Sequence, residues 1–151
     1  MQSFAHFTPT PQKIVAQKPK TISSKEEFEV IKTHCMQGAN MLRRLENFED
    51  DPLLQTAYDI ARWHHERWDG RGYPDGLKGN DIPISAQIVS LADVYDALTS
   101  ERCYKEAFSH ETAMRMILNG ECGAFNPLLL ECLTDIQAEL QEKLQNITIN
   151  R

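Results

Sequence analysis

The stretch of sequence that decides the fold runs from residue 64 to residue 74 and reads His64-His65-Glu66-Arg67-Trp68-Asp69-Gly70-Arg71-Gly72-Tyr73-Pro74. Two adjacent histidines end a helical pattern, and a loop with two glycines and a proline follows at once. The packing of an apolar core does not explain this combination of residues. We interpret it as a pair of metal ligands joined to a loop of fixed shape. The alternative is a pair without a metal role, in which one histidine is buried and the other is exposed.

Helical periodicity surrounds this stretch on both sides and predicts an all-α fold, a bundle of about five helices. Apolar residues recur at helical spacing in five segments, at about residues 24–46, 52–67, 83–100, 110–119 and 128–145. The segment at 83–100 is apolar nearly all round, which predicts a central position in the bundle. Residues 68–82 are rich in glycine and proline and predict a long loop with several turns.

The length and composition of the chain predict one domain that follows an irregular N-terminal segment. A chain of 151 residues fits a single domain. Prolines interrupt residues 1–24, whereas helical patterns fill residues 25–148, so we expect an irregular segment followed by a helical domain. The formal charge of −6 argues against a general nucleic-acid binder. No apolar run is long enough for a membrane helix, and the first residues lack the pattern of a signal peptide.

The cysteines predict a reducing environment. They are Cys35, Cys103, Cys122 and Cys132, and no two of them form the Cys-x-x-Cys pair of a cysteine zinc site. We interpret them as free thiols, which favours a cytoplasmic protein.

Two residues extend the metal hypothesis beyond the histidine pair. Asp93 lies in the most apolar helical segment, where a buried carboxylate needs a partner such as a metal ion; the alternative is a solvated helix edge. His34 precedes Gly38 by one turn and is either a ligand or a histidine at the edge of the core. Imidazole and carboxylate ligands together suit iron, manganese, zinc or nickel. Two such ions lying close together would activate water against a phosphodiester.

Two cations follow the segment that contains Asp93. Arg102 and Lys105 could hold phosphate oxygens. They could equally be solvated cations near the negative end of a helix.

Several motifs in order resemble the HD-GYP family. The letters of its name are Gly72-Tyr73-Pro74, and further matches are Lys32-Thr33-His34 with Gly38, Gly76-Leu77-Lys78-Gly79, Ile82-Pro83, Ala92-Asp93-Val94-Tyr95-Asp96-Ala97-Leu98, Arg102-x-Tyr104-Lys105 and Phe125-x-Pro127. The resemblance covers about residues 18–133. It implies a helical bundle of the HD superfamily around a two- or three-metal centre, in a bacterial hydrolase of the second messenger cyclic di-GMP.

The resemblance also implies roles for individual residues. The family's metal ligands match His34, His64, His65 and Asp93. Its substrate-binding residues match Tyr73, Arg102 and Lys105, and its recognition loop includes Gly70, Gly72 and Pro74. The implied cofactors are two or more divalent ions, iron or manganese first. The implied reaction opens cyclic di-GMP to pGpG, and in some members continues to GMP.

One departure from the family bears on activity. Its His-Asp dyad is expected upstream of His34, where this chain reads Phe4-Ala5-His6, and no histidine of the chain is followed by aspartate. Either the chain begins just past a lost dyad, or His6-Phe7 is a degenerate one. Without the bridging aspartate, four protein ligands must serve two ions, so we expect weaker metal binding. We also expect apolar faces of the bundle to be exposed.

Three functions remain open at this point. The first is a cyclic di-GMP phosphodiesterase domain of impaired activity. The second is a non-catalytic module that binds cyclic di-GMP or docks a partner, such as a diguanylate cyclase domain or an upstream receiver or sensor domain. The third is a remnant that folds poorly alone and exposes an apolar patch.

Overall fold

The computed structural model describes residues 25–101 and 106–149, and these residues form an all-α fold, as predicted. The segment 1–24, which the sequence predicts to be irregular, lies outside the described residues, as do Cys103 and the predicted phosphate ligands Arg102 and Lys105. The helices are α1 (Lys25–Arg43), α2 (Pro52–Trp63), α3 (Ile84–Thr99), α4 (His110–Leu118), α5 (Pro127–Asp135) and α6 (Gln137–Ile149), with a short 3-10 helix at Gly79–Asp81.

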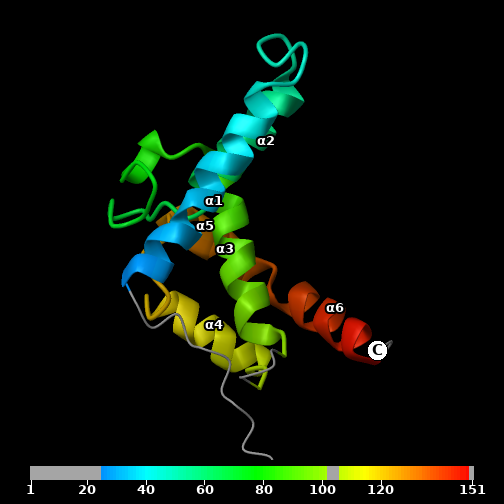
Figure 1. The fold of residues 1–151 in the computed structure, drawn as a ribbon. Helices are drawn as coiled ribbons and strands as arrows, with labels where there is room; N and C mark the ends of the chain where they lie inside the picture. Colours follow the sequence, from blue (N-terminus) through cyan, green and yellow to red (C-terminus); the bar gives the residue numbers. More distant parts are fainter. Residues whose placement is uncertain (1–24, 102–105, 150–151) are drawn as a thin grey trace, which may run out of the picture.

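The helices form two packed groups that meet at α3 (Figure 1). The α1 and α2 helices run side by side, α2 packs on α3, and α3 packs on α4. The loop between α2 and α3 projects to one side of the α1–α2 pair. The central place of α3 agrees with its nearly uniform apolar sequence.

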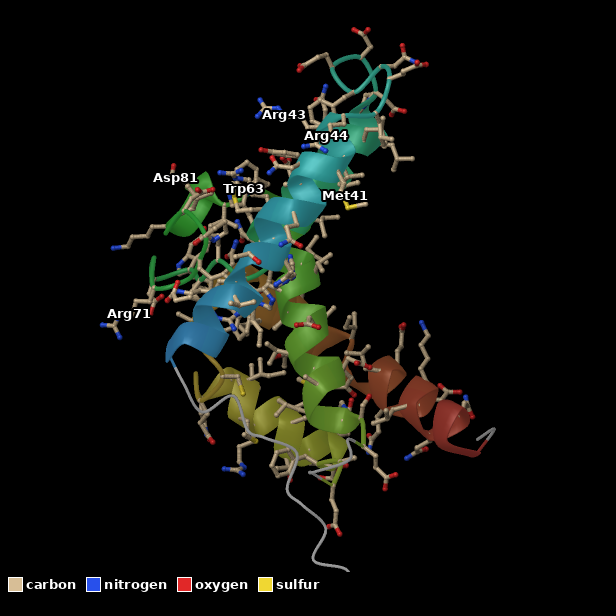
Figure 2. All side chains as sticks on the ribbon, viewed as in Figure 1. Met41, Arg43, Arg44, Trp63, Arg71 and Asp81 are labelled. Atoms are coloured by element: carbon tan, nitrogen blue, oxygen red, sulfur yellow. The ribbon has the colours of Figure 1, made fainter. Side chains whose placement is uncertain are left out.

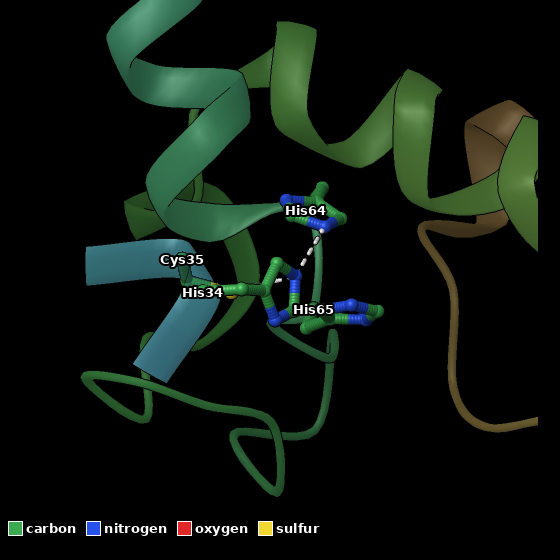
Figure 3. A group of neighbouring side chains, drawn as sticks. All are labelled: His34, Cys35, His64 and His65. Carbon is green, nitrogen blue, oxygen red and sulfur yellow. Dashed lines mark hydrogen bonds between the residues drawn. The ribbon is translucent and has the colours of Figure 1, made fainter. Parts of the chain in front are cut away.

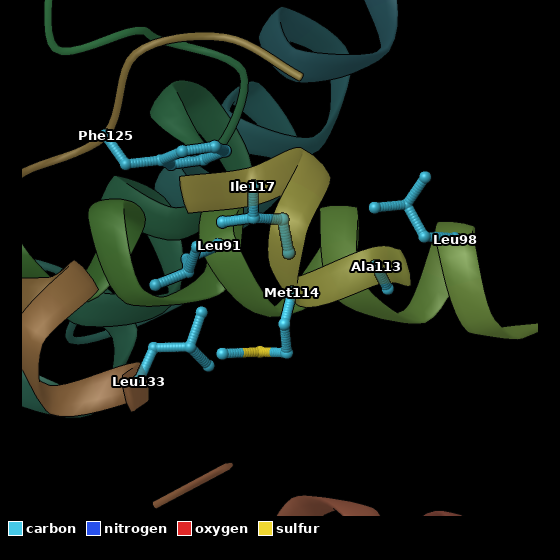
Figure 4. Close-up of a cluster of buried hydrophobic side chains, with 7 residues drawn as sticks. All are labelled: Leu91, Leu98, Ala113, Met114, Ile117, Phe125 and Leu133. Atoms are coloured by element: carbon cyan, nitrogen blue, oxygen red, sulfur yellow. The ribbon is translucent and has the colours of Figure 1, made fainter. Parts of the chain in front are cut away.

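The apolar core lies between α3, α4 and α5 (Figure 4). Its centre is the fully buried Ile117 of α4, and the other buried members are Leu91, Leu98, Ala113, Met114, Phe125 and Leu133. Burial of these side chains from water supplies the main driving force for this half of the fold.

Two helix boundaries differ from the sequence prediction. The second helix ends at Trp63 rather than near residue 67, so His64 is its C-cap and His65 lies in the following turn. The predicted helix at 128–145 is wrong as one unit, because it is divided at Ile136 into α5 and α6. The Thr134 hydroxyl donates to the Leu130 carbonyl oxygen at 2.8 Å, a bond that bends helices, and it lies just before the break.

An apolar groove of about 410 Å³ opens between α3, α5 and α6. Its walls are Ile88, Leu91, Ala92, Tyr95, Leu129, Cys132, Leu133, Ile136 and Leu140. Ile88 and Ile136 keep about half of their surface in contact with solvent. Among the described residues, no helix is both long and apolar enough to cross a membrane.

Candidate metal centre

Close packing of α1 against α2 sets the position of the candidate centre. Ala39 on α1 is fully buried, and a Cβ added to Gly38 would lie 3.5 Å from the Ala61 Cβ on α2. Small residues at this crossing let the two backbones approach. As a result, His34 of α1 faces the two histidines that follow α2.

The three histidines and one cysteine form a single cluster (Figure 3). The ligand atoms of His34, Cys35, His64 and His65 all lie within 4.8 Å of one another. The His34 Nε2 is 3.3 Å from the His64 Nε2 and 3.5 Å from the Cys35 Sγ. The His64 and His65 rings are 4.1 Å apart between centroids. Histidines from two separate segments therefore converge on one point.

Backbone carbonyls fix the tautomers of two of these histidines. The His34 Nδ1 lies 2.6 Å from the Ile31 carbonyl oxygen, and the His64 Nδ1 lies 2.8 Å from the Ile60 carbonyl oxygen. A carbonyl oxygen can only accept, so each Nδ1 carries the proton and donates it. In the neutral rings the two Nε2 lone pairs then face each other across 3.3 Å. This arrangement is the usual outer-shell support of a metal-binding histidine.

The donor set fits a divalent transition metal. Two lone pairs that face each other repel unless a proton or a metal ion lies between them. Three imidazoles suit zinc, iron, copper or nickel, whereas magnesium and calcium prefer oxygen ligands. His34, His64 and His65 are therefore the residues that would hold an ion here.

His65 is held in its neutral form, which is the form that binds metals. Its pKa is lowered from 6.5 to about 4, chiefly by burial and then by the neighbouring His64 and His34. Asp93 opposes this shift, because its negative charge favours the protonated ring. The Tyr73 ring stacks on His65 at 4.8 Å and forms one wall of the centre.

The loop that carries Tyr73 follows its path because its backbone passes very close to the turn after α2. A Cβ added to Gly72 would lie 2.4 Å from the Glu66 Cα and 2.4 Å from the Arg67 nitrogen, so only glycine fits. The next residue, Tyr73, donates its backbone N–H to the His65 carbonyl oxygen at 3.2 Å. Gly72 therefore places Tyr73 against His65, one of the candidate ligands.

Glu66 fixes the far end of the same loop. Its side chain is buried, and one carboxylate oxygen accepts the backbone N–H groups of Asp75 and Gly76 at 2.7 and 3.0 Å. The other oxygen is buried with no partner among the described residues. Glu66 also lines a cavity of about 10 Å³, near the smallest volume that holds one water molecule.

Asp75 ties the loop back to α2. Its carboxylate accepts hydrogen bonds from the Arg62 guanidinium at 2.7 and 3.0 Å and from the Trp63 indole N–H at 2.7 Å. The hydrogen bond from Arg62 holds the pKa of Asp75 below its usual value. By contrast, Arg71 extends outward from the loop with 88% of its side chain exposed (Figure 2). One face of the loop is thus anchored and the other is open to solvent.

The structure places the predicted site residues unequally. It brings together His34, His64 and His65, with the Tyr73 ring stacked on His65, and Gly72 passes against the turn after α2, whereas Gly70 lies against Lys78 and no contact links Pro74 to the histidines among the described interactions. Asp93 is exposed on α3 and outside the four-residue cluster, although its charge raises the pKa values of His65 and Tyr73.

Sequence reasoning missed three residues of this region. Cys35 reads as one more apolar position of α1, and its only signal is that it follows His34 directly. Glu66 and Asp75 act mainly on nearby backbone and side-chain donors, for which the sequence has no spacing signal. Burial raises the pKa of the Cys35 thiol, and the nearby Glu66 raises it further.

The sequence of the chain matches a known protein family. A family model described as HD domain matches residues 6–124, which is most of the chain. The chain belongs to the HD domain family. The HD-GYP motifs recognised in the sequence are thereby confirmed as a family relationship.

Curated relatives of this HD domain come from several bacteria. The chain is 45% identical over 108 residues to a "Probable cyclic di-GMP phosphodiesterase" of Vibrio cholerae, an alignment that covers 70% of this chain and 24% of that protein. It is 40% identical over 121 residues to a "Cyclic di-GMP phosphodiesterase" of Thermotoga maritima, covering 80% and 32%. A "3'3'-cGAMP-specific phosphodiesterase 2" of Vibrio cholerae is 36% identical, covering 80% and 22%. The chain thus spans about a quarter to a third of the relatives' lengths.

Proposed function

We propose that this chain is a metal-dependent phosphodiesterase domain that acts on a cyclic dinucleotide, with cyclic di-GMP as substrate. The observation that carries the proposal is the convergence of His34, His64 and His65 with the Nδ1 protons of two rings bound to carbonyls. Three converging imidazoles are a ligand set that suits divalent transition metals. Asp93 is proposed as a further ligand, which its electrostatic proximity to His65 supports.

Each residue of the centre has a proposed task. Divalent ions, when bound, polarise a phosphodiester and make water a stronger nucleophile at neutral pH. His34, His64 and His65 hold the ions, and the Tyr73 ring borders the centre on the side of the loop. Lys32 lies with its Nζ 5.9 Å from the centre of the Tyr73 ring and can attract a substrate phosphate. Arg102 and Lys105 remain proposed phosphate ligands outside the described residues.

The relatives favour cyclic di-GMP over the related dinucleotide 3'3'-cGAMP. Relatives named for cyclic di-GMP are 45%, 44%, 40%, 39% and 36% identical to this chain, and those named for 3'3'-cGAMP are 36%, 30% and 37% identical. One relative of Xanthomonas campestris is a "response regulator RpfG", which supports a receiver domain as the proposed regulatory partner. A diguanylate cyclase domain docked on the loop remains a further proposed partner.

The test is turnover of cyclic di-GMP by the purified chain with manganese or ferrous iron, with pGpG and GMP separated by chromatography. We expect metal-dependent product, faster with cyclic di-GMP than with 3'3'-cGAMP. His65→Ala should abolish product, and circular dichroism should show that its helical content is kept. Absence of product at every metal concentration that saturates the chain would overturn the proposal.

A second function, a non-catalytic module that binds cyclic di-GMP, is favoured by one observation. The described residues contain a single cluster of candidate ligands, and Asp93 lies outside it, whereas a two-ion reaction needs ligands for both ions. The sequence also contains no His-Asp pair. Binding of cyclic di-GMP by calorimetry without any turnover would assign this second function.

A further inference from the structure

Cys35 is the member of the cluster to which the family resemblance gives no role. Its side chain is fully buried, it directly follows His34 on α1, and its Sγ lies 3.5 Å from the His34 Nε2 (Figure 3). A thiol in this place is either a core residue that donates a weak hydrogen bond or a metal ligand. The 3.5 Å separation is compatible with both, and the unpaired ring nitrogens around it favour the metal ligand.

The measured separations match two edges of a tetrahedral metal site. With Zn–N of about 2.0–2.1 Å and Zn–S of about 2.3 Å, tetrahedral angles place two nitrogens about 3.3–3.4 Å apart and a nitrogen and a sulfur about 3.5–3.6 Å apart. The His34 and His64 Nε2 atoms are 3.3 Å apart, and the Cys35 Sγ is 3.5 Å from the His34 Nε2. Both printed separations from the His34 Nε2 thus fit an ion bound to it, and the three ligand atoms lie within 4.8 Å of one another.

A hydrogen bond from the thiol alone leaves one ring nitrogen unpaired. One S–H can donate to one Nε2, and because both Nδ1 protons are held by carbonyls, the other Nε2 still needs a proton or a metal ion to pair with. A single cation among the four ligand atoms would pair with the facing Nε2 lone pairs of His34 and His64 together. One His65 ring nitrogen and the Cys35 sulfur lie within the same 4.8 Å limit.

We propose that Cys35 is the fourth protein ligand of a closed site with three nitrogens and one sulfur, and that zinc is its preferred ion. On binding, the S–H bond breaks, the proton passes to solvent, and a sulfur lone pair forms the bond to zinc. This proposal rests on the proposed metal binding by the three histidines, and it does not need the chain to be a phosphodiesterase.

A cysteine ligand would affect both which metal ion the chain binds and whether water can bind to that ion. A thiolate favours zinc over manganese, because manganese prefers oxygen ligands. A four-ligand zinc site has no open position for water, whereas a catalytic site keeps one. Zinc in this site would therefore fix α1 to the end of α2 and would compete with the ions that the proposed hydrolysis needs.

Cobalt is the probe for a thiolate ligand. We would titrate the metal-stripped full chain with Co²⁺ and record the near-ultraviolet band of sulfur-to-cobalt charge transfer together with the intense visible bands of tetrahedral Co²⁺. The wild type and Cys132→Ser should both show these bands, since Cys132 is an exposed cysteine on α5. Cys35→Ser should lack the charge-transfer band and bind zinc more weakly by on the order of tenfold or more, as measured against a competing chelator.

A direct measurement keeps the test valid even where Cys35→Ser fails to fold. X-ray absorption at the zinc edge of the wild-type chain should show one sulfur at about 2.3 Å and three nitrogens at about 2.0–2.1 Å. A shell of nitrogen and oxygen alone would overturn the proposal and would leave the phosphodiesterase function open. A sulfur shell in a chain that never turns over cyclic di-GMP would support Cys35 and overturn the proposed function.

Discussion

The two halves of this molecule are held together by different forces. Between α3, α4 and α5, apolar side chains such as Leu91, Ile117 and Leu133 are buried against one another. In the half made of α1, α2 and the loop, α2 buries no residue fully, and the buried positions of α1 include the small Cys35 and Ala39. There the contacts are the hydrogen bonds of Glu66 and Asp75 and close backbone approach.

This difference separates stability from site geometry. Apolar burial is strong and non-directional, so the core half supplies most of the free energy of folding. Hydrogen bonds contribute little net stability but fix directions. Substitutions in the two halves should therefore change different quantities. Those in the core should lower the free energy of unfolding, and those in the site should lower the metal affinity.

The largest expected effect is that of Ile117→Ala in the core. Removing this fully buried side chain leaves a cavity and should lower the free energy of unfolding by about 3–4 kcal/mol. Urea titration followed by circular dichroism measures the loss. Leu53→Ala, at a side chain that is 74% exposed, is the control and should change stability by less than about 0.5 kcal/mol. Equal losses would mean that the two halves are not distinct.

Gly72→Ala should have the next largest effect, and it should act on both measurements. The new Cβ would overlap the backbone of Glu66 and Arg67, so the loop must move and take Tyr73 away from His65. We expect a loss of about 1–3 kcal/mol of stability. We also expect zinc affinity to fall on the order of tenfold, as for loss of an outer-shell partner.

Gly79→Ala is the matched control for that change. Gly79 has a φ of +58° but no atom within 4 Å of an added Cβ, so alanine costs about 1 kcal/mol of backbone strain and displaces nothing. Its zinc affinity should equal that of the wild type. Equal weakening by both substitutions would show that loop flexibility, rather than close approach, controls the centre.

The sequence predicted the helices well because their signals are local. The all-round apolar character of α3 indicated its central place, and α4, at His110–Leu118, ends within one residue of the predicted range 110–119. The end of α2 at Trp63 was missed because the polar residues after it are compatible with a continued helical periodicity. The break at Ile136 was missed because the apolar periodicity continues across it, from Leu133 to Leu140.

The candidate centre was predictable in part, and for a different reason. Adjacent histidines before a glycine-rich loop are unusual enough to indicate ligands, but the pairing of His34 with them came from family resemblance. Cys35 was read as a core position, because a buried thiol and a metal-binding thiol produce the same pattern along a helix. What points to the second role is the position of Cys35 beside His34, whose Nε2 also lies 3.3 Å from the His64 Nε2 at the end of α2.

A third substitution, Asp75→Asn, tests the anchored face of the loop against its open face. Asp75 accepts three hydrogen bonds from Arg62 and Trp63, so loss of its charge should cost about 1–2 kcal/mol. Asp69→Asn is the control, because its ion pair with Arg71 is 3.8 Å long and largely exposed. That change should cost almost nothing. A cost for Asp69→Asn as large as that for Asp75→Asn would remove the distinction between the two faces.

The smallest effect concerns protonation of His65 in the metal-free chain. Its pKa is about 4 in the folded state and near 6.5 when unfolded, so between these pH values only the unfolded chain holds the proton. Stability should therefore fall as the pH is lowered from about 6.5 to about 4, by about 1 kcal/mol once solvent screening is included. NMR of the histidine ring protons measures the titration, with His65→Gln identifying the signal and removing this part of the pH dependence. A midpoint near 6.5 would show that His65 is open to water, and the site half would then lack the burial that keeps this ligand neutral.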